Sequence, residues 1–231
     1  RLYYREIWIM LKTFERMSET IKDEVYVMGQ KVVVANELSL EAIESKNVKL
    51  FSKAKSELNN ISHMSNKIDN LILRALALHQ PEAKDLRQMV SYLKITNEIV
   101  RAGTNTKSFI KNFSKSFHKE VDFDTIFEFS IPLQKSSIEA IKTSIKIVKM
   151  NDTQEIELSF QKVLVEENKT DDLYAMIEKT LLKKLSSKVE LSKDYLDILS
   201  SLRRLEKVAD RAASIANLLL FAHLGGELHQ A

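Results

Sequence analysis

The chain has 231 residues, of which 44% are hydrophobic and 29% are charged, a composition typical of a soluble globular protein with a sizeable core. With only 4 glycines and 2 prolines it lacks the many tight turns of a β-sandwich or an α/β fold, so long helices with few connections are expected. The net charge of +3 gives no reason to expect a nucleic-acid partner, and the absence of cysteine excludes disulfides, thiolate metal sites and cysteine catalysis.

Apolar residues at heptad spacing predict three long helices in the first half of the chain. The first covers about residues 5–37, and Ser39 is a candidate N-cap for the second helix. The second helix lasts until His79, because Pro81 pushes the residue before it out of helical dihedrals. A third helix begins near Pro81 or Glu82, with proline in its first turn.

The same pattern begins again in the second half. A fourth helix covers about residues 124–150, and Pro132 either kinks it or marks its true start. A turn at residues 151–153 precedes a fifth helix that runs to about residue 187. The sixth helix starts near Leu191, and Gly225 ends it.

Two successive sets of three long helices with short connections predict an all-α fold of six long helices. They form two tandem antiparallel three-helix bundles with a pseudo-twofold internal repeat. The repeat is visible in the residues, because the segment 66–71 (NKIDNL) matches 168–173 (NKTDDL), and Val100 aligns with Glu206. The repeats would cover residues 1–117 and 118–231.

Two pairs of carboxylates lie beside the apolar stripes of the last two predicted helices. Glu206 and Asp210 are one helical turn apart, and so are Glu167 and Asp171 on the preceding helix. On adjacent antiparallel helices the two pairs can converge into a cluster of four carboxylates, which needs cations because like charges raise each other's pKa. Oxygen ligands without cysteine suit magnesium, calcium, manganese or iron.

Three segments resemble the PhoU family of phosphate-signalling proteins. Residues 79–87 (HQPEAKDLR) and 93–98 (LKITNE) are similar to the family's QPxAxDLR…LKI segment. Residues 205–212 (LEKVADRA) are similar to its LERIGDxA segment, and the resemblance extends from about residue 25 to 221. The family implies two tandem three-helix bundles, usually in a dimer, with metal clusters held on the bundle surface by paired E(D)xxxD motifs.

The resemblance carries over asymmetrically between the two repeats. Both motifs are intact in the second repeat, at Glu167 with Asp171 and at Glu206 with Asp210, so these four residues are the expected metal ligands. The equivalent positions in the first repeat are Ser65, Asp69, Val100 and Thr104, and Asp69 is the one carboxylate among them. Divalent or iron-type metal ions are therefore expected at the second repeat only.

The resemblance implies a non-enzymatic cytoplasmic regulator of phosphate uptake and a negative regulator of phosphate-starvation signalling. It would act as an adaptor between the ATPase subunit of a phosphate transporter and a sensor histidine kinase, as a homodimer. No apolar run reaches the length of a membrane span. Two other functions stay open: the PhoU-like regulatory domain of a sodium/phosphate cotransporter, and a carboxylate-bridged metal enzyme.

A structural interpretation of the acidic pairs is also open. Glu206 and Asp210 lie within one helical turn of Arg203, Lys207 and Arg211, so they can form ordinary surface ion pairs, each of which contributes little to stability.

Overall fold

A computed structural model of the chain describes residues 2–116, 121–187 and 191–226. Within these ranges every regular element is an α-helix, which confirms the predicted all-α class. The helices are α1 (Leu2–Glu44), α2 (Lys49–Glu57), α3 (Ile61–His79), α4 (Ala83–Ser116), α5 (Phe123–Ile147), α6 (Thr153–Ser187) and α7 (Ser192–Leu224).

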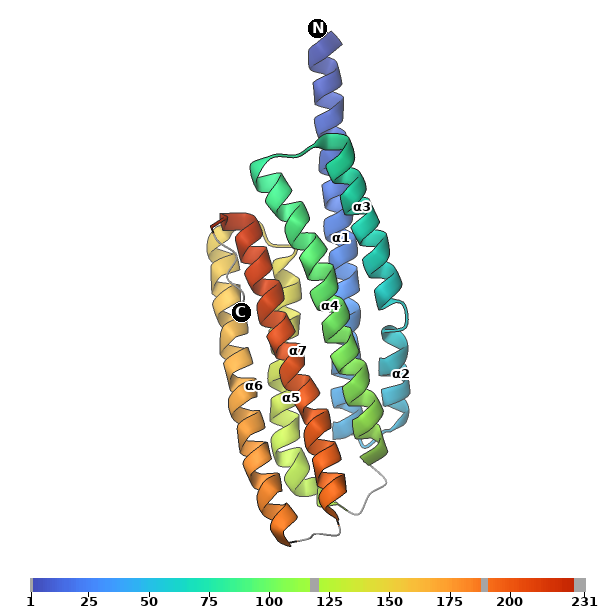
Figure 1. Ribbon diagram of the computed structural model, residues 1–231, viewed down its shortest axis with the longest axis vertical. Coiled ribbons are helices and arrows are strands. Elements are labelled where there is room, and N and C mark those ends of the chain that lie inside the picture. The colour runs from blue at the N-terminus through green and yellow to red at the C-terminus, as the bar shows by residue number, and fades with distance from the viewer. Residues whose placement is uncertain (1, 117–120, 188–190, 227–231) are drawn as a thin grey trace.

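Two antiparallel three-helix bundles lie side by side (Figure 1). The first contains α1, the broken helix α2–α3 and α4, and the second contains α5, α6 and α7. Helices α4 and α7, the third helix of each bundle, run antiparallel along the middle and join the two bundles. The predicted tandem architecture is confirmed, whereas the predicted limit between residues 117 and 118 lies outside the described residues.

The predicted start of the second helix at Ser39 is wrong, because α1 continues to Glu44. Asn36 and Ser39 are both fully buried inside α1. The Asn36 amide donates to the hydroxyl of Thr106 on α4 (2.9 Å), and the Gln134 amide of α5 donates to the hydroxyl of Ser39 (2.8 Å). The Asn36 amide nitrogen and the Ser39 hydroxyl, which could otherwise favour a helix break, thus have partners on α4 and α5.

The predicted second helix is in fact interrupted. Helix α2 ends at Glu57 and α3 begins at Ile61, with the adjacent asparagines Asn59 and Asn60 between them. Asparagine favours turns because its side chain competes for backbone hydrogen bonds. Helix α3 ends at His79, as predicted, and Gln80 after it lies in the left-handed region (φ 46°). Helix α4 begins at Ala83, so the prediction that Pro81 lies in its first turn is wrong.

The second bundle follows the sequence pattern closely. Helix α5 continues through Pro132, so this proline does not mark the start of the helix. Helix α5 instead begins after Asp122, whose side chain accepts a hydrogen bond from the backbone of Thr125. Helix α7 ends before Gly225, as predicted. Its expected apolar stripe is buried, at Leu202, Leu205, Ala209, Ala212, Ala216 and Leu219.

The bundles share their core. Each of two clusters of buried apolar side chains draws residues from both bundles. Gly29 lies where α1 meets α5, and a Cβ at this position would be 2.4 Å from Cδ1 of Ile145. Close packing therefore fixes how the bundles sit against each other. Among the described helices, none combines the length and the apolar character needed to cross a lipid bilayer.

Candidate metal centre

Helix α6 presents Glu167 and Asp171 at the edge of the second bundle. They lie between the buried residues Val163 and Tyr174, which anchor this part of α6 to the core. Thr170 is fully buried between them, and its hydroxyl donates to the backbone carbonyl of Glu167 (2.6 Å). The buried hydroxyl therefore has its partner within the helix and does not need either carboxylate as an acceptor.

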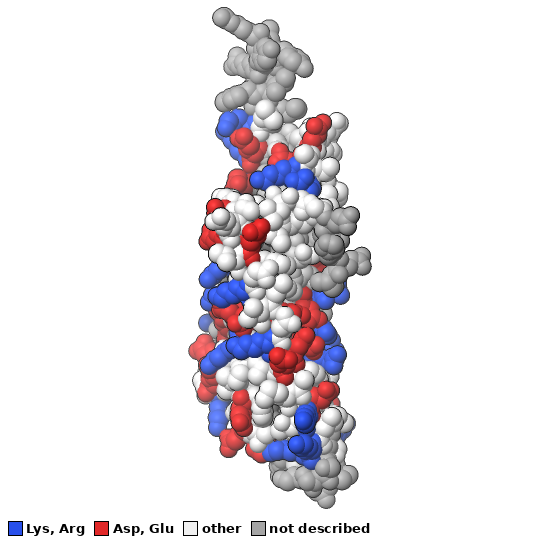
Figure 2. All heavy atoms as spheres, turned by 90° about the vertical axis from the view of Figure 1, so that its left-hand side faces the viewer, with Lys and Arg blue, Asp and Glu red and all other residues white. Residues whose placement is uncertain are grey.

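Helix α7 supplies the other two carboxylates. Glu206 and Asp210 each follow a fully buried residue, Leu205 and Ala209. One carboxylate oxygen from each of Glu167, Asp171 and Asp210 lies within 4.8 Å of the others. The tertiary structure thus brings three of the four predicted ligands into one group, which we call the carboxylate cluster. Acidic side chains gather just below the middle of the face that carries α6 (Figure 2).

Glu206 lies next to the carboxylate cluster but is more deeply placed. It is only 9% exposed, and its buried Oε2 has no hydrogen-bond donor among the described residues. The nearest cation to this oxygen in an ion pair is Arg203, whose Nε lies 3.8 Å away. A buried carboxylate oxygen without a donor is costly, so an additional cation at this point would be stabilising.

The electrostatics of the carboxylate cluster show that its charges interact. Burial raises the pKa of Glu167, and the negative charges of Asp171, Asp210 and Glu206 raise it further. Burial and the charge of Asp210 likewise raise the pKa of Asp171. Lys207 opposes both shifts. Burial and mutual repulsion thus both disfavour the ionised forms of Glu167 and Asp171, and a bound cation would relieve the repulsion.

Lys207 is the principal cation at the cluster. Its Nζ lies 2.8 Å from Oδ2 of Asp210 and 3.4 Å from Oε1 of Glu206. The hydrogen bond to Asp210 raises the pKa of Lys207. Arg211 lies farther from Asp210, at 3.9 Å. The ion pairs with Arg203, Lys207 and Arg211 that the sequence left open are thus all present: Lys207 and Arg211 contact Asp210 of the cluster, and Arg203 and Lys207 contact the neighbouring Glu206.

The first repeat has no comparable cluster among its described residues. Ser65 is buried, and Asp69 accepts a hydrogen bond from the hydroxyl of Thr96 (2.7 Å). Val100 packs against the core, and the Thr104 hydroxyl donates to the backbone carbonyl of Val100 (2.9 Å). Asp69 is therefore the one carboxylate at these positions, and it already accepts a hydrogen bond from the Thr96 hydroxyl.

The sequence did not predict a group of basic residues that the structure places between α4 and α7. A surface hollow between α4 and α7 is lined by four basic residues and two neutral ones, and we call it the basic hollow. The neutral residues are Thr104 and Asn105, and the basic residues are Arg101, Arg204, Lys207 and Arg211. The available signal was the spacing of the three α7 residues at i, i+3 and i+7, which places them on one helix face. The contribution of α4 depends on tertiary packing and leaves no such signal.

Comparison with known proteins agrees with the fold and with the repeat. The family model described as PhoU domain matches twice, at residues 25–112 and 133–219. The phosphate-specific transport system accessory protein PhoU homolog of Aquifex aeolicus is 24% identical over 189 residues, which cover 74% of this chain and 75% of that protein. The phosphate-specific transport system accessory protein PhoU of Escherichia coli is 21% identical over 226 residues, which cover 93% and 89%.

Solved structures show the same architecture. The crystal structure of PhoU from Pseudomonas aeruginosa superposes with a TM-score of 0.81 at 19% identity, covering 92% of this chain and 100% of that one. The phosphate transport system regulatory protein PhoU from Streptococcus pneumoniae superposes with a TM-score of 0.75 at 20% identity, covering 94% and 100%.

Proposed function

This chain belongs to the PhoU family, and we propose that it is a non-enzymatic regulator of phosphate transport whose second bundle binds metal ions. The two family matches fall on the two bundles, and the curated relatives are phosphate-transport accessory proteins. The observation that carries the metal function is the convergence of Glu167, Asp171 and Asp210 within 4.8 Å.

The donor set fits a hard metal ion. Three carboxylates face each other, and the buried Oε2 of Glu206 beside them lacks a hydrogen-bond donor. Carboxylate oxygens suit divalent or iron-type ions. Glu167, Asp171 and Asp210 would hold the ion, with Glu206 as the neighbouring carboxylate. The ion would supply positive charge between α6 and α7 and so stabilise the pairing of these helices.

Regulation would follow from docking on other proteins in the cytoplasm. We expect two partners, the ATPase subunit of a phosphate transporter and a sensor histidine kinase, with the chain acting as a homodimer and a negative regulator. Metal binding would favour one docking-competent arrangement of α6 and α7, because a bound ion stabilises only the state that presents its ligands together.

The metal assignment is tested on the full chain purified without chelator. Metal content is measured by inductively coupled plasma mass spectrometry for wild type and for the double variant Glu206→Ala/Asp210→Ala. We expect the variant to lose the metal, whereas Glu157→Gln, an exposed acid elsewhere on α6, keeps it. Equal metal content in the double variant would show that the ligands lie elsewhere.

The regulatory assignment is tested by co-purification. The tagged full chain is mixed with the phosphate-transporter ATPase subunit or with the histidine kinase from the same organism. We expect both to be retained, and we expect a phosphate-starvation reporter to rise in phosphate-rich cells that lack the chain. A reporter that is unchanged when the chain is lost would contradict the regulatory function.

The metal-enzyme interpretation has no supporting observation. Such sites in helical bundles use Glu-x-x-His pairs, and the carboxylate cluster contains only Glu and Asp among the described residues. We expect the metal-loaded protein to show no redox turnover.

A further inference from the structure

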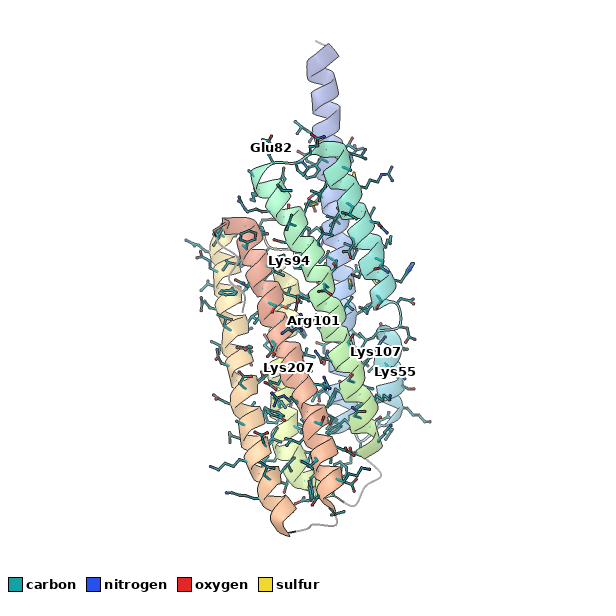
Figure 3. The ribbon with its side chains drawn as sticks, in the orientation of Figure 1. Lys55, Glu82, Lys94, Arg101, Lys107 and Lys207 are labelled. Carbon is teal, nitrogen blue, oxygen red and sulfur yellow. The ribbon has the colours of Figure 1, made fainter. Side chains whose placement is uncertain are left out.

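The basic hollow lies in the surface groove between α4 and α7, where Figure 3 labels Arg101 on one helix and Lys207 on the other. It has a volume of about 310 Å³, at the lower end of the range for small-molecule pockets. Within the described part of the chain, every charged residue that lines it is basic. Thr104 and Asn105 add neutral hydrogen-bonding groups.

The internal repeat accounts for one pair of cations in the hollow. The alignment that pairs Val100 with Glu206 also pairs Arg101 with Lys207, and α4 runs antiparallel to α7. Arg101 and Lys207, equivalent residues of the two repeats, therefore line the hollow from its two helices. The same alignment pairs Thr104 with Asp210. At this position the first repeat therefore has a hydroxyl residue, which lines the hollow, and the second repeat has a carboxylate, which does not.

Two arginines of the hollow are held by one acid. Glu98 accepts from Arg211 (2.9 Å) and from Arg101 (3.1 Å). The Arg211 side chain is only 19% exposed, so its guanidinium is fixed in place before any ligand arrives. Glu98 itself does not line the hollow. A pre-positioned guanidinium loses less conformational entropy when it binds an anion.

Arg204 is the least compensated cation of the hollow. It is exposed and has no ion-pair partner among the described residues. Lys207 completes the set and is shared with the carboxylate cluster through its contact with Asp210 (2.8 Å). Guanidinium groups match phosphate oxygens with two parallel hydrogen bonds, and an ammonium adds a point charge.

We propose that the basic hollow binds a phosphate oxyanion, with Arg101, Arg204 and Arg211 as its principal ligands. The ligand is either free inorganic phosphate or the terminal phosphate of a nucleotide. None of the three arginines belongs to the carboxylate cluster, so the oxyanion site does not rest on the proposed metal function.

The test is a titration of the full chain with inorganic phosphate in low-salt buffer that contains EDTA, followed by calorimetry or by amide chemical shifts. We expect saturable binding that weakens as salt is added. Arg204→Gln and Arg101→Gln should each weaken it about fivefold or more, since each removes a charge-assisted contact. The matched control is Lys55→Gln, which removes an exposed charge from α2, on the other side of α4 from α7 and outside the lining of the hollow, and should bind as wild type does.

A parallel titration with ATP distinguishes the two sources of the phosphate group. Tighter binding of ATP, weakened by the same two arginine variants, assigns the site to a nucleotide phosphate, and tighter binding of phosphate assigns it to the free ion. The proposal is overturned if wild type binds none of these anions saturably, or if Lys55→Gln weakens binding as much as Arg204→Gln. Because EDTA is present throughout, this result is independent of the metal analysis of Glu206→Ala/Asp210→Ala.

Discussion

Removing one charge from the carboxylate cluster should stabilise the metal-free protein. Glu167→Gln keeps the shape of the side chain and removes its charge. The pKa of Glu167 is raised in the folded protein, first by burial and then by Asp171 and Asp210. The stabilisation from this group is therefore complete below its ordinary pKa of about 4.3 and is lost as pH rises through the raised value. At pH 7 the ionised Glu167 opposes folding.

The size of the effect follows from the geometry. Carboxylate oxygens within 4.8 Å of each other repel by about 0.9 kcal/mol in bulk water and by about 3.5 kcal/mol at an effective dielectric constant of 20. Lys207 attracts the same carboxylates, and the site is partly exposed, so the lower figure is the better guide. We expect a gain of about 1 kcal/mol in the free energy of unfolding, or about 2–4 °C in melting temperature.

The assay is thermal unfolding of wild type and Glu167→Gln in EDTA, with Glu157→Gln as the control on the same helix. The advantage of Glu167→Gln should be present at pH 7 and shrink as the pH is lowered toward about 4. Manganese should reverse the order, because wild type gains about 2.7 kcal/mol at a hundredfold excess of metal over its dissociation constant. A lower melting temperature of Glu167→Gln in EDTA at pH 7 would refute the reasoning.

Three further predictions concern other parts of the molecule. Lys207→Met removes the cation that competes for Asp210, so manganese affinity measured by calorimetry should rise about fivefold. Gly29→Ala forces a methyl group against Ile145, and urea unfolding should show a loss of about 1–3 kcal/mol. Asp122→Ala removes the N-cap of α5 at a cost of about 1 kcal/mol in urea unfolding at pH 7. Hydrogen bonds from Lys184 lower the pKa of Asp122, so this difference should diminish as pH falls below about 3.9.

Each of these predictions has a contrary result. Weaker manganese binding by Lys207→Met would mean that this lysine supports the metal site instead of competing with the ion. Unchanged stability of Gly29→Ala would show that the packing of α1 on α5 is loose. A loss in Asp122→Ala that is equally large in acid would mean that the ionised carboxylate is not what stabilises the start of α5.

The regular part of the molecule was predictable because its causes are local. The stripe of α7 repeats every three or four residues, and the spacing of Glu206 and Asp210 already places them on one helix face. The pair Glu167 and Asp171 was visible on α6 for the same reason. Their convergence was expected from antiparallel packing, and the structure brings one oxygen each of Glu167, Asp171 and Asp210 within 4.8 Å.

The errors lie where distant partners override a local preference. Ser39 indicated the start of a new helix, yet α1 continues, because a hydrogen bond from Gln134, 95 residues farther along the chain, pairs the Ser39 hydroxyl; nearby, the Asn36 amide donates to Thr106, 70 residues farther along. No local pattern contains such partners. The adjacent asparagines at 59 and 60 are the opposite case, since their turn preference was present in the sequence and the apolar periodicity concealed it.

The sequence by itself determined the helical class, the tandem repeat and the two acidic pairs, because helix periodicity and side-chain spacing are properties of short segments. Only the tertiary structure decided that Lys207 lies between the carboxylate cluster and the basic hollow. It also decided that cations of α4 and α7 face each other across the groove. Both depend on how two antiparallel helices from different repeats pack side by side, and that arrangement is fixed by the shared core of the bundles.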